Sequence, residues 1–499
     1  MGLALGAAIF LGLLCLNAPM RWVGFLLGDA AVVLVAWFSG NPRLLCLWGF
    51  ALTMPLNLSQ YFGQIYYTKA GGENGFRIES SDLFLVALAG FLAWDILSGR
   101  RRGLRIPKVS FLWVAIMFMG FLAMAFSRNR MDAAHEVVRM AKLLLLFLVV
   151  CNELERPRRF LHCAAALTLS VAAESLIGLI EYVRKANFGL GILGETDQRT
   201  IEILAATSVR TEKIFRASAF LLHPNLLGIF LAASLPLAVG LFLYKTGKGS
   251  KLFFLAGVVL GISALVVTFS RSGWLSFAVA FTLVMSLLMA NPALRRRSLL
   301  TAAGAALILV GFGAVFYGPI TTRMFESKED AMLGRAEFEA DAKRMIAESP
   351  WIGWGLNSYV DELPAFSKWS PSAFGGYLPP VHHIYYLWWA ETGLVGLMLH
   401  LAMWGSIVWT GVRNLRVKNE LLYTINAACL GSMIALSIDG FFSFSLRVSS
   451  IYKLFWVLAG IILAVHYWRL CNGLPRPELK PVRQANPRNT ADMEIAFGG

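Results

Sequence analysis

Charge, cysteine and long polar segments are all scarce in this chain. Only 15% of its 499 residues are charged, and six are cysteine. No cysteine lies in a long polar segment, so we expect neither a disulfide framework nor a cysteine metal cluster. The six cysteines are Cys15, Cys46, Cys151, Cys163, Cys429 and Cys471.

Three motifs that bind phosphate or metal are also missing from the sequence. It has no Asp-x-Asp pair, no Gly-x-x-x-x-Gly-Lys-Ser/Thr phosphate loop and no His-Glu-x-x-His zinc pattern. An Asp-x-Asp pair could bridge a divalent metal to a diphosphate, and the other two motifs carry nucleotide and zinc sites. We therefore expect chemistry that uses no metal and no cofactor.

Hydrophobic residues are abundant instead. They make up 57% of the chain, and the mean hydropathy is +0.62. Soluble domains are about 45–50% apolar and lack repeated apolar runs of about 20 residues. The runs are continuous and do not alternate, which disfavours a β-barrel. We predict an all-α, polytopic transmembrane helical bundle of about 12–14 spans.

The apolar runs start directly at the N-terminus. Residues 2–16 have no basic segment before them and no convincing cleavage site after them, so we interpret them as a retained first span. The approximate limits of the candidate spans are 2–18, 22–38, 43–58, 80–98, 109–126, 136–152, 159–183, 217–243, 252–269, 273–290, 299–317, 383–410, 420–440 and 450–469.

This prediction divides the chain into four parts. Residues 1–317 carry the first eleven spans, and residues 383–469 carry the last three. Between them, residues 318–382 form a polar loop of roughly 64 residues, in which we expect an amphipathic helix. Residues 470–499 are rich in Pro, Arg and Asn, and we expect a disordered cytoplasmic tail.

Basic clusters in the short loops predict the orientation, because such loops stay in the cytoplasm. With the spans above, all the clusters fall on one side, together with both termini. The clusters lie at 100–108, 156–159, 245–251, 295–297, 413–418 and 476–488. The net charge of +15 is therefore interpreted as an orientation signal facing membrane lipids, not as a nucleic-acid site.

The same topology places the polar loop on the outer, extracytoplasmic side of the membrane. ATP is not available there, so any group transfer needs a donor that is activated before it crosses the membrane. We accordingly search the outer side for residues that could carry the chemistry.

Three arginines are expected on the outer side: Arg216, Arg271 and Arg335. Interfacial arginines commonly snorkel to lipid phosphates, and each of the three could do only that. Arg271 is the strongest candidate for another role, since the positive-inside bias disfavours arginine in its tight outer turn. Guanidinium groups hold phosphate oxygens with two prongs, so several converging arginines would suit a diphosphate.

His382 and His383 lie where the polar loop re-enters the bilayer. A neutral imidazole can accept a proton from an attacking hydroxyl near pH 7. The alternative is an interfacial histidine at a helix N-terminus. Adjacent residues on a helix point in different directions, so at most one of the two should face a given cavity.

Other polar positions each have two or more interpretations. Asn225, after Pro224, either organises a polar cavity or marks a structural kink. The helix predicted over 335–349 has one apolar face, which could lie on the membrane, close over a cavity or pack against the spans. Trp354 and Tyr359 belong to a glycine- and aromatic-rich turn, whose rings could stack on sugars or form an interfacial belt.

Three carboxylates are predicted inside spans, which is costly unless each has a partner. They are Asp95, Glu174 and Glu391. These positions leave a polysaccharide transporter as an alternative. A transporter predicts inverted repeats and broken spans at mid-membrane, whereas this sequence shows no clear repeat and gathers its polar candidates at the outer rim.

An ordered set of short motifs resembles the O-antigen ligase family. Each motif is weak alone, but together they cover about residues 210–400 in the family's order. The motifs are Arg216…Pro224-Asn225, Ser270-Arg271, Gly334-Arg335, Pro350-Trp351-Ile352-Gly353-Trp354-Gly355, and His382-His383 followed by Gly393-Leu394-Val395-Gly396. The family usually carries Asn, Ser or Gln after its catalytic histidine. This chain has His383 there, and the spacing to Gly393 favours His382 as the catalytic one.

The resemblance implies a metal-independent, inverting glycosyltransferase with a GT-C-like, multi-span fold. Its donor would be a glycan on undecaprenyl diphosphate, and its acceptor a hydroxyl of the lipid A core or of another glycan. His382 would activate or orient the acceptor hydroxyl. Arg216, Arg271 and Arg335 would bind the diphosphate. Supporting positions would be His383, Asn225, Trp354 and Tyr359.

Two related activities share these motifs and stay open from the sequence. One is an O-antigen or exopolysaccharide polymerase, which uses the same kind of donor. The other is a protein O-oligosaccharyltransferase, which transfers the glycan to a protein.

Overall fold

The computed structural model describes residues 40–56, 58–62, 72–126, 130–190, 195, 215–244, 247–315, 317, 329–370 and 378–472. The predicted spans 2–18 and 22–38 lie outside the described residues, as does nearly all of the predicted tail.

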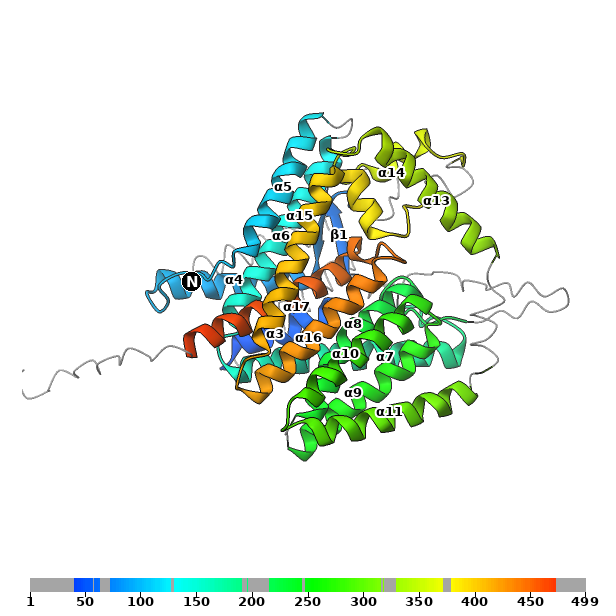
Figure 1. Cartoon of the computed structure of the whole chain (residues 1–499). Helices are drawn as coiled ribbons and strands as arrows, with labels where there is room; N and C mark the ends of the chain where they lie inside the picture. The colour runs from blue at the N-terminus through cyan, green and yellow to red at the C-terminus, as the bar shows by residue number, and fades with distance from the viewer. Residues whose placement is uncertain are drawn as a thin grey trace, which may run out of the picture.

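Helices dominate the described residues, and the predicted all-α, polytopic membrane fold is confirmed (Figure 1). Eight of the helices described are long and apolar enough to cross a membrane. They are α4 (Ser80–Leu97), α7 (Pro157–Arg184), α8 (Pro224–Leu243), α9 (Lys248–Val267), α10 (Arg271–Ala290), α15 (Ile384–Asn414), α16 (Glu420–Asp439) and α17 (Ser449–Asn472).

Further helices coincide with the remaining predicted spans from 43–58 onward. They are α3 (Pro42–Thr53), α5 (Val109–Phe126), α6 (Arg130–Glu153) and α11 (Arg295–Val315). The polar loop contains α13 (Glu329–Glu348), α14 (Tyr359–Glu362) and the 3-10 turn η3 (Leu363–Ala365), and a second 3-10 turn, η5 (Ser445–Arg447), precedes α17.

The core of the bundle is built on α8 and α16. Their apolar windows are 89% and 83% buried, far more than the 33% of α9 and α10. Both helices pack against α10, and α8 also packs against α9. A Cβ added to Gly273 of α10 would lie 3.0 Å from the backbone of Gly228 in α8. Small residues thus let the N-terminal parts of α8 and α10 approach closely.

The start of α8 differs from the predicted span 217–243. Pro224 occupies the first helical turn, where its fixed φ and missing N–H are tolerated. The preceding segment is irregular, with positive φ at Ala219 and Leu222. The helix therefore begins later than its apolar run, and residues 215–223 form an irregular loop before it.

The two ends of the bundle differ in character. We call the end where α8, α10 and α15 begin and α16 ends the rim end, and the opposite end the basic end. At the rim end, Ile384 donates its N–H to the carbonyl of Gly440 at 2.8 Å. At the basic end, Arg43 forms ion pairs with Asp95 and Glu153. Asp95, one of the costly carboxylates of the sequence, therefore has a partner.

Two features of the loops were not specified by the sequence. A short antiparallel hairpin joins β1 (Ser59–Phe62) to β2 (Phe76–Glu79), with Ser59 opposite Glu79. The helix predicted over 335–349 is α13, which begins earlier, at Glu329.

Figure 1 shows α13 at one end of the bundle, beyond the main set of parallel helices. Its apolar face is buried and packs against α15, so the third interpretation of that helix, packing onto the spans, is the observed one. The buried residues are Phe338, Ala342, Met345 and Ile346.

Candidate active site

A cavity of about 420 Å³ opens at the rim end. Four segments that are distant in sequence contribute to it: the start of α8, the start of α10, the middle of α13 and the turn after α16. The lining residues are Asn225, Arg271, Ser272, Leu275, Arg335, Ala336, Glu339 and Phe442. We call this space the rim cavity.

Arg271 and Arg335 bring two positive charges to the rim cavity. Both are partly buried, and among the described residues neither has a carboxylate at ion-pair distance. Burial lowers the pKa of Arg335, and the like charge of Arg271 lowers it further, while Asp439 and Glu339 partly oppose this. Two adjacent cations in a concave, partly desolvated site attract an anion with several oxygens, such as a diphosphate.

Arg216 lies behind the wall of the rim cavity. It is buried, with Nε donating to the Thr268 carbonyl at 2.8 Å and Nη2 donating to Asn225 Oδ1 at 2.7 Å. This arginine thus braces the turn before α10 against the start of α8. Asn225 lines the cavity and has its amide oxygen engaged by Arg216, which leaves its amide nitrogen as a donor for a ligand.

Two carboxylates of α7 hold the loop that carries Arg216. Glu181 accepts the backbone N–H groups of Ser218 and Ala219, at 3.1 and 2.9 Å. Glu174 accepts the N–H of Phe220 at 3.1 Å. Glu174 was one of the carboxylates that allowed a transporter as an alternative. In the structure it has a structural role, because it accepts a hydrogen bond from the loop before α8.

His382 lies beside this charged cavity. Its ring meets that of Phe444 edge-on, with centroids 5.2 Å apart. Burial lowers the pKa of His382 to about 4, the charge of Arg335 lowers it too, and a hydrogen bond from the ring to the Pro380 carbonyl opposes both. The imidazole is therefore neutral at physiological pH, which is the form that can accept a proton.

His383 has a different environment and a visible structural task. It is the N-cap of α15, and its Nδ1 accepts the backbone N–H of Tyr386 at 3.3 Å. Its ring stacks on Tyr386 with centroids 4.1 Å apart. The two adjacent histidines thus face different neighbours, and the geometry separates a helix cap from the imidazole next to Arg335.

The part of the chain that contains most of these residues matches a known protein family. Residues 256–401 match a family model described as O-antigen ligase. The match covers less than a third of the chain and supports the resemblance of that region to the O-antigen ligase family. It spans Arg271, Arg335 and His382 and supports a ligase- or polymerase-type glycosyltransferase activity. No curated protein sequence gives a significant match to the chain.

Two other residues singled out from the sequence, Trp354 and Tyr359, do not line the rim cavity. Trp354 donates its indole N–H to the Met345 carbonyl at 2.8 Å, and its ring packs against Phe366. It lines a second, mostly apolar cavity of about 630 Å³. Tyr359 is buried, which raises the pKa of its hydroxyl, and that hydroxyl lies near the backbone of Val381.

The glycine motifs of the ligase-like region form one structural unit. Gly393 breaks α15 with φ +65°, and a Cβ there would lie 2.1 Å from the Trp351 carbonyl oxygen. Backbone groups exposed by the break pair with the loop before α14: Leu394 donates to Pro350 at 2.8 Å, and Trp354 donates to Ala390 at 2.9 Å. The two motifs therefore dock the polar loop onto α15 by main-chain hydrogen bonds.

Sequence reasoning missed several residues at the rim cavity. Asp439, the last residue of α16, bonds to the Ser445 hydroxyl and also interacts with Ser272 and Arg335. Phe442 lines the cavity and Phe444 covers His382. The available signal was a carboxylate at the outer end of the predicted span 420–440, followed by a phenylalanine-rich turn.

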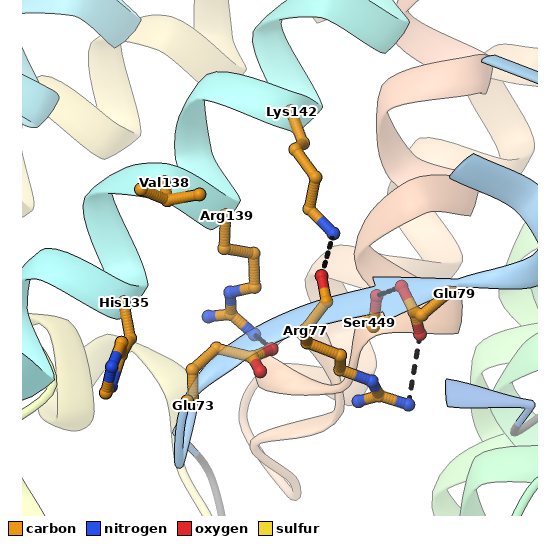
Figure 2. Close-up of a pocket in the computed structure, with 9 residues that line it drawn as sticks. Glu73, Arg77, Glu79, His135, Val138, Arg139, Lys142 and Ser449 are labelled. Carbon is orange, nitrogen blue, oxygen red and sulfur yellow. Dashed lines mark hydrogen bonds and ion pairs between the residues drawn. The ribbon is translucent and has the colours of Figure 1, made fainter. Parts of the chain in front are cut away.

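A second polar group, the buried ion network, lies between α4, α6, α17 and the β-hairpin. Figure 2 shows Arg139 facing Glu73 and Arg77 beside Glu79. The corresponding atoms are 3.3 and 3.0 Å apart. Arg139 also contacts Glu136 at 2.5 Å. In this network cations and carboxylates contact one another, as structural ion pairs do.

No group of three or more His, Cys, Asp or Glu side chains in the described part of the chain is arranged to hold a metal ion. The rim cavity instead carries two cations, one amide, one hydroxyl and the Glu339 carboxylate, and the neutral imidazole of His382 lies beside it. These groups can bind an anion and accept a proton.

Proposed function

We propose that this protein transfers a glycan from undecaprenyl diphosphate to an acceptor hydroxyl, taken to be one of the lipid A core. The reaction would occur at the rim end, on the periplasmic side of the bacterial inner membrane. The observation that carries the proposal is a cavity lined by two cations, neither of which has an ion-pair partner among the described residues, with a neutral histidine beside it.

The arginines would act on the leaving group. As the bond from the anomeric carbon to the diphosphate oxygen breaks, its electron pair leaves with the diphosphate, and negative charge builds there. Arg271 and Arg335 are placed at the cavity before the reaction starts, so little reorganisation is needed to stabilise that charge. Arg216 would act indirectly by holding Asn225 at the cavity wall.

His382 would act on the acceptor. Its neutral imidazole takes the proton of the acceptor hydroxyl while the hydroxyl oxygen forms the new bond to the anomeric carbon. Direct attack from the side opposite the diphosphate inverts the anomeric configuration. Metal-independent transfer is what the family resemblance implies, and none of these steps requires a metal.

Donor binding would also strengthen the base. The free site lowers the pKa of His382 by burial and by the charge of Arg335. A bound diphosphate neutralises part of that charge, so the pKa of His382 rises towards its usual range when the donor is present. The imidazole would then accept a proton most readily once the donor is in place.

The direct test is transfer by purified protein with a lipid-linked glycan and an acceptor. His382→Ala should lower transfer by roughly a hundredfold or more, because general-base catalysis is typically worth that much. His383→Asn is the matched control, since asparagine also caps helices, and it should keep most of the activity. Near-normal transfer by His382→Ala would overturn the assignment.

A deletion strain distinguishes the ligase from the polymerase. Loss of a ligase leaves long polymer on undecaprenyl diphosphate, whereas loss of a polymerase leaves single repeat units on the core. Glycan missing from a protein, with the lipopolysaccharide unchanged, would indicate a protein O-oligosaccharyltransferase instead.

A further inference from the structure

Arg447 is a buried arginine in the short turn between α16 and α17. It is 4% exposed. Its guanidinium contacts both oxygens of the Glu391 carboxylate: Nη2 donates a hydrogen bond to Oε1 at 3.3 Å, and Nη1 lies at ion-pair distance from Oε2, at 3.1 Å. Two contacts to one planar group restrict its orientation as well as its distance.

The partners of Arg447 come from three other segments. Glu391 lies directly before the break in α15 at Gly393. Glu136 of α6 lies 3.4 Å from Nη1, and Asn357 of the polar loop accepts from Nη2 at 3.4 Å. Arg447 therefore fastens the turn after α16 to the break in α15, to α6 and to the polar loop.

The fastened turn also reaches the rim cavity. Arg447 donates its backbone N–H to the Phe444 carbonyl at 2.8 Å. The Phe444 ring packs edge-on to His382, and Phe442 lines the cavity. The side chain that anchors the turn is thus three residues from the ring that covers the imidazole.

We propose that Arg447 is a positioning residue for glycosyl transfer. By gripping Glu391, it holds residues 440–447 so that Phe444 shields His382 and Phe442 closes the wall of the rim cavity. The role in transfer depends on the proposed function, whereas the shielding of His382 does not.

The charged groups around His382 determine its pKa, so the pKa can report whether the turn has loosened. Arg335 of α13 is the charged group that acts on His382 directly, and Asp439 acts on Arg335. Glu339 and Lys343 of α13 face His383, and the Tyr359 hydroxyl lies near Val381. None of these groups is itself substituted in an Arg447 variant, so a shift in His382 titration would report the loosened turn.

The experiment compares Arg447→Met, Arg447→Lys and Glu391→Gln with the wild type over a range of pH. Lost shielding exposes His382 and raises its pKa, so the acid limb of the transfer rate should move to higher pH by about one unit or more. We expect kcat to fall roughly ten- to a hundredfold, with a smaller change in the KM for donor. Arg447→Lys should be intermediate, because it keeps the charge but not the contacts to both carboxylate oxygens.

Arg43→Met is the matched control. Arg43 also contacts two carboxylates, Asp95 at 2.6 Å and Glu153 at 3.3 Å, but it does so at the basic end. This variant should lose thermal stability without moving the acid limb. Folded Arg447→Met with the wild-type acid limb and the wild-type kcat would overturn the proposal.

Two further readouts keep the test decisive. If Arg447→Met does not fold, Arg447→Lys and Glu391→Gln provide the same comparison, and unchanged pH profiles in both overturn the proposal.

If the wild type transfers no glycan, the proposed function fails. The shielding is then read from the pH dependence of diethyl pyrocarbonate modification at His382, resolved by peptide fragmentation. Identical modification in wild type and variants would refute it.

Discussion

The rim cavity and the buried ion network both contain charged groups, but only in the network do the cations contact carboxylates. In the network, Arg139 contacts Glu136 and Glu73, and Lys453 contacts Glu79 and Asp82. At the cavity, Arg271 and Arg335 face open space, and neither forms an ion pair within the described residues.

The free-energy cost of burying a charge explains why the two arrangements indicate different roles. A buried charge is tolerated when a counter-charge and hydrogen bonds replace the lost water. Two neighbouring arginines without a carboxylate at contact distance repel each other, so the fold gains nothing from holding them together. Buried ion pairs thus indicate a structural role, whereas neighbouring groups of like charge indicate a binding site for a ligand of opposite charge.

The largest expected effect on stability is at the buried network. Arg139→Met leaves Glu136 and Glu73 buried without their cation, which should cost about 3–5 kcal/mol of unfolding free energy. The measurement is the thermal unfolding midpoint in detergent. A midpoint equal to that of the wild type would mean that the network does not support the fold, and the comparison would fail.

The opposite pattern is expected at the rim cavity. Arg335→Met should lower transfer by roughly a hundred- to a thousandfold, because loss of one preset donor to a developing anion typically costs that much. Arg271→Lys should lower it less, because the charge is kept. Their unfolding midpoints should stay near the wild type, since no ion pair is lost. Unchanged transfer in both variants would return these arginines to a role in binding lipid headgroups.

The smallest expected effect concerns Trp354. Trp354→Phe keeps an aromatic ring against Phe366 but removes the hydrogen bond to the Met345 carbonyl, which is worth about 1 kcal/mol. Transfer should be nearly normal, because Trp354 does not line the rim cavity. A large rise in the KM for a glycan substrate, with normal stability, would instead indicate the sugar-stacking role considered from the sequence.

Some candidate residues can be recognised from the sequence because their signals are local. Arg271 in a tight outer turn and His382 at the end of a polar loop stand out from hydropathy and charge alone. In the structure, both lie near Arg335.

Other parts of the site depend on partners distant in sequence. Arg216 was expected to contact the diphosphate, but it is engaged by Asn225 and the Thr268 carbonyl. The Pro350–Gly355 run was considered a display of aromatic rings, but its backbone pairs with α15 at the break. Glycine patterns in a sequence do not tell whether a ligand or another backbone makes the close approach.

The sequence by itself determined the class of this protein: an all-α polytopic membrane fold with one long polar loop. Each of these follows from a property of consecutive residues, namely apolar length and charge density. Only the tertiary structure decided which arginines face a cavity, which histidine caps a helix, and that Glu391 is held by Arg447. Those outcomes depend on which helices become neighbours, because desolvation and charge pairing act between residues that are distant in sequence, such as Glu391 and Arg447.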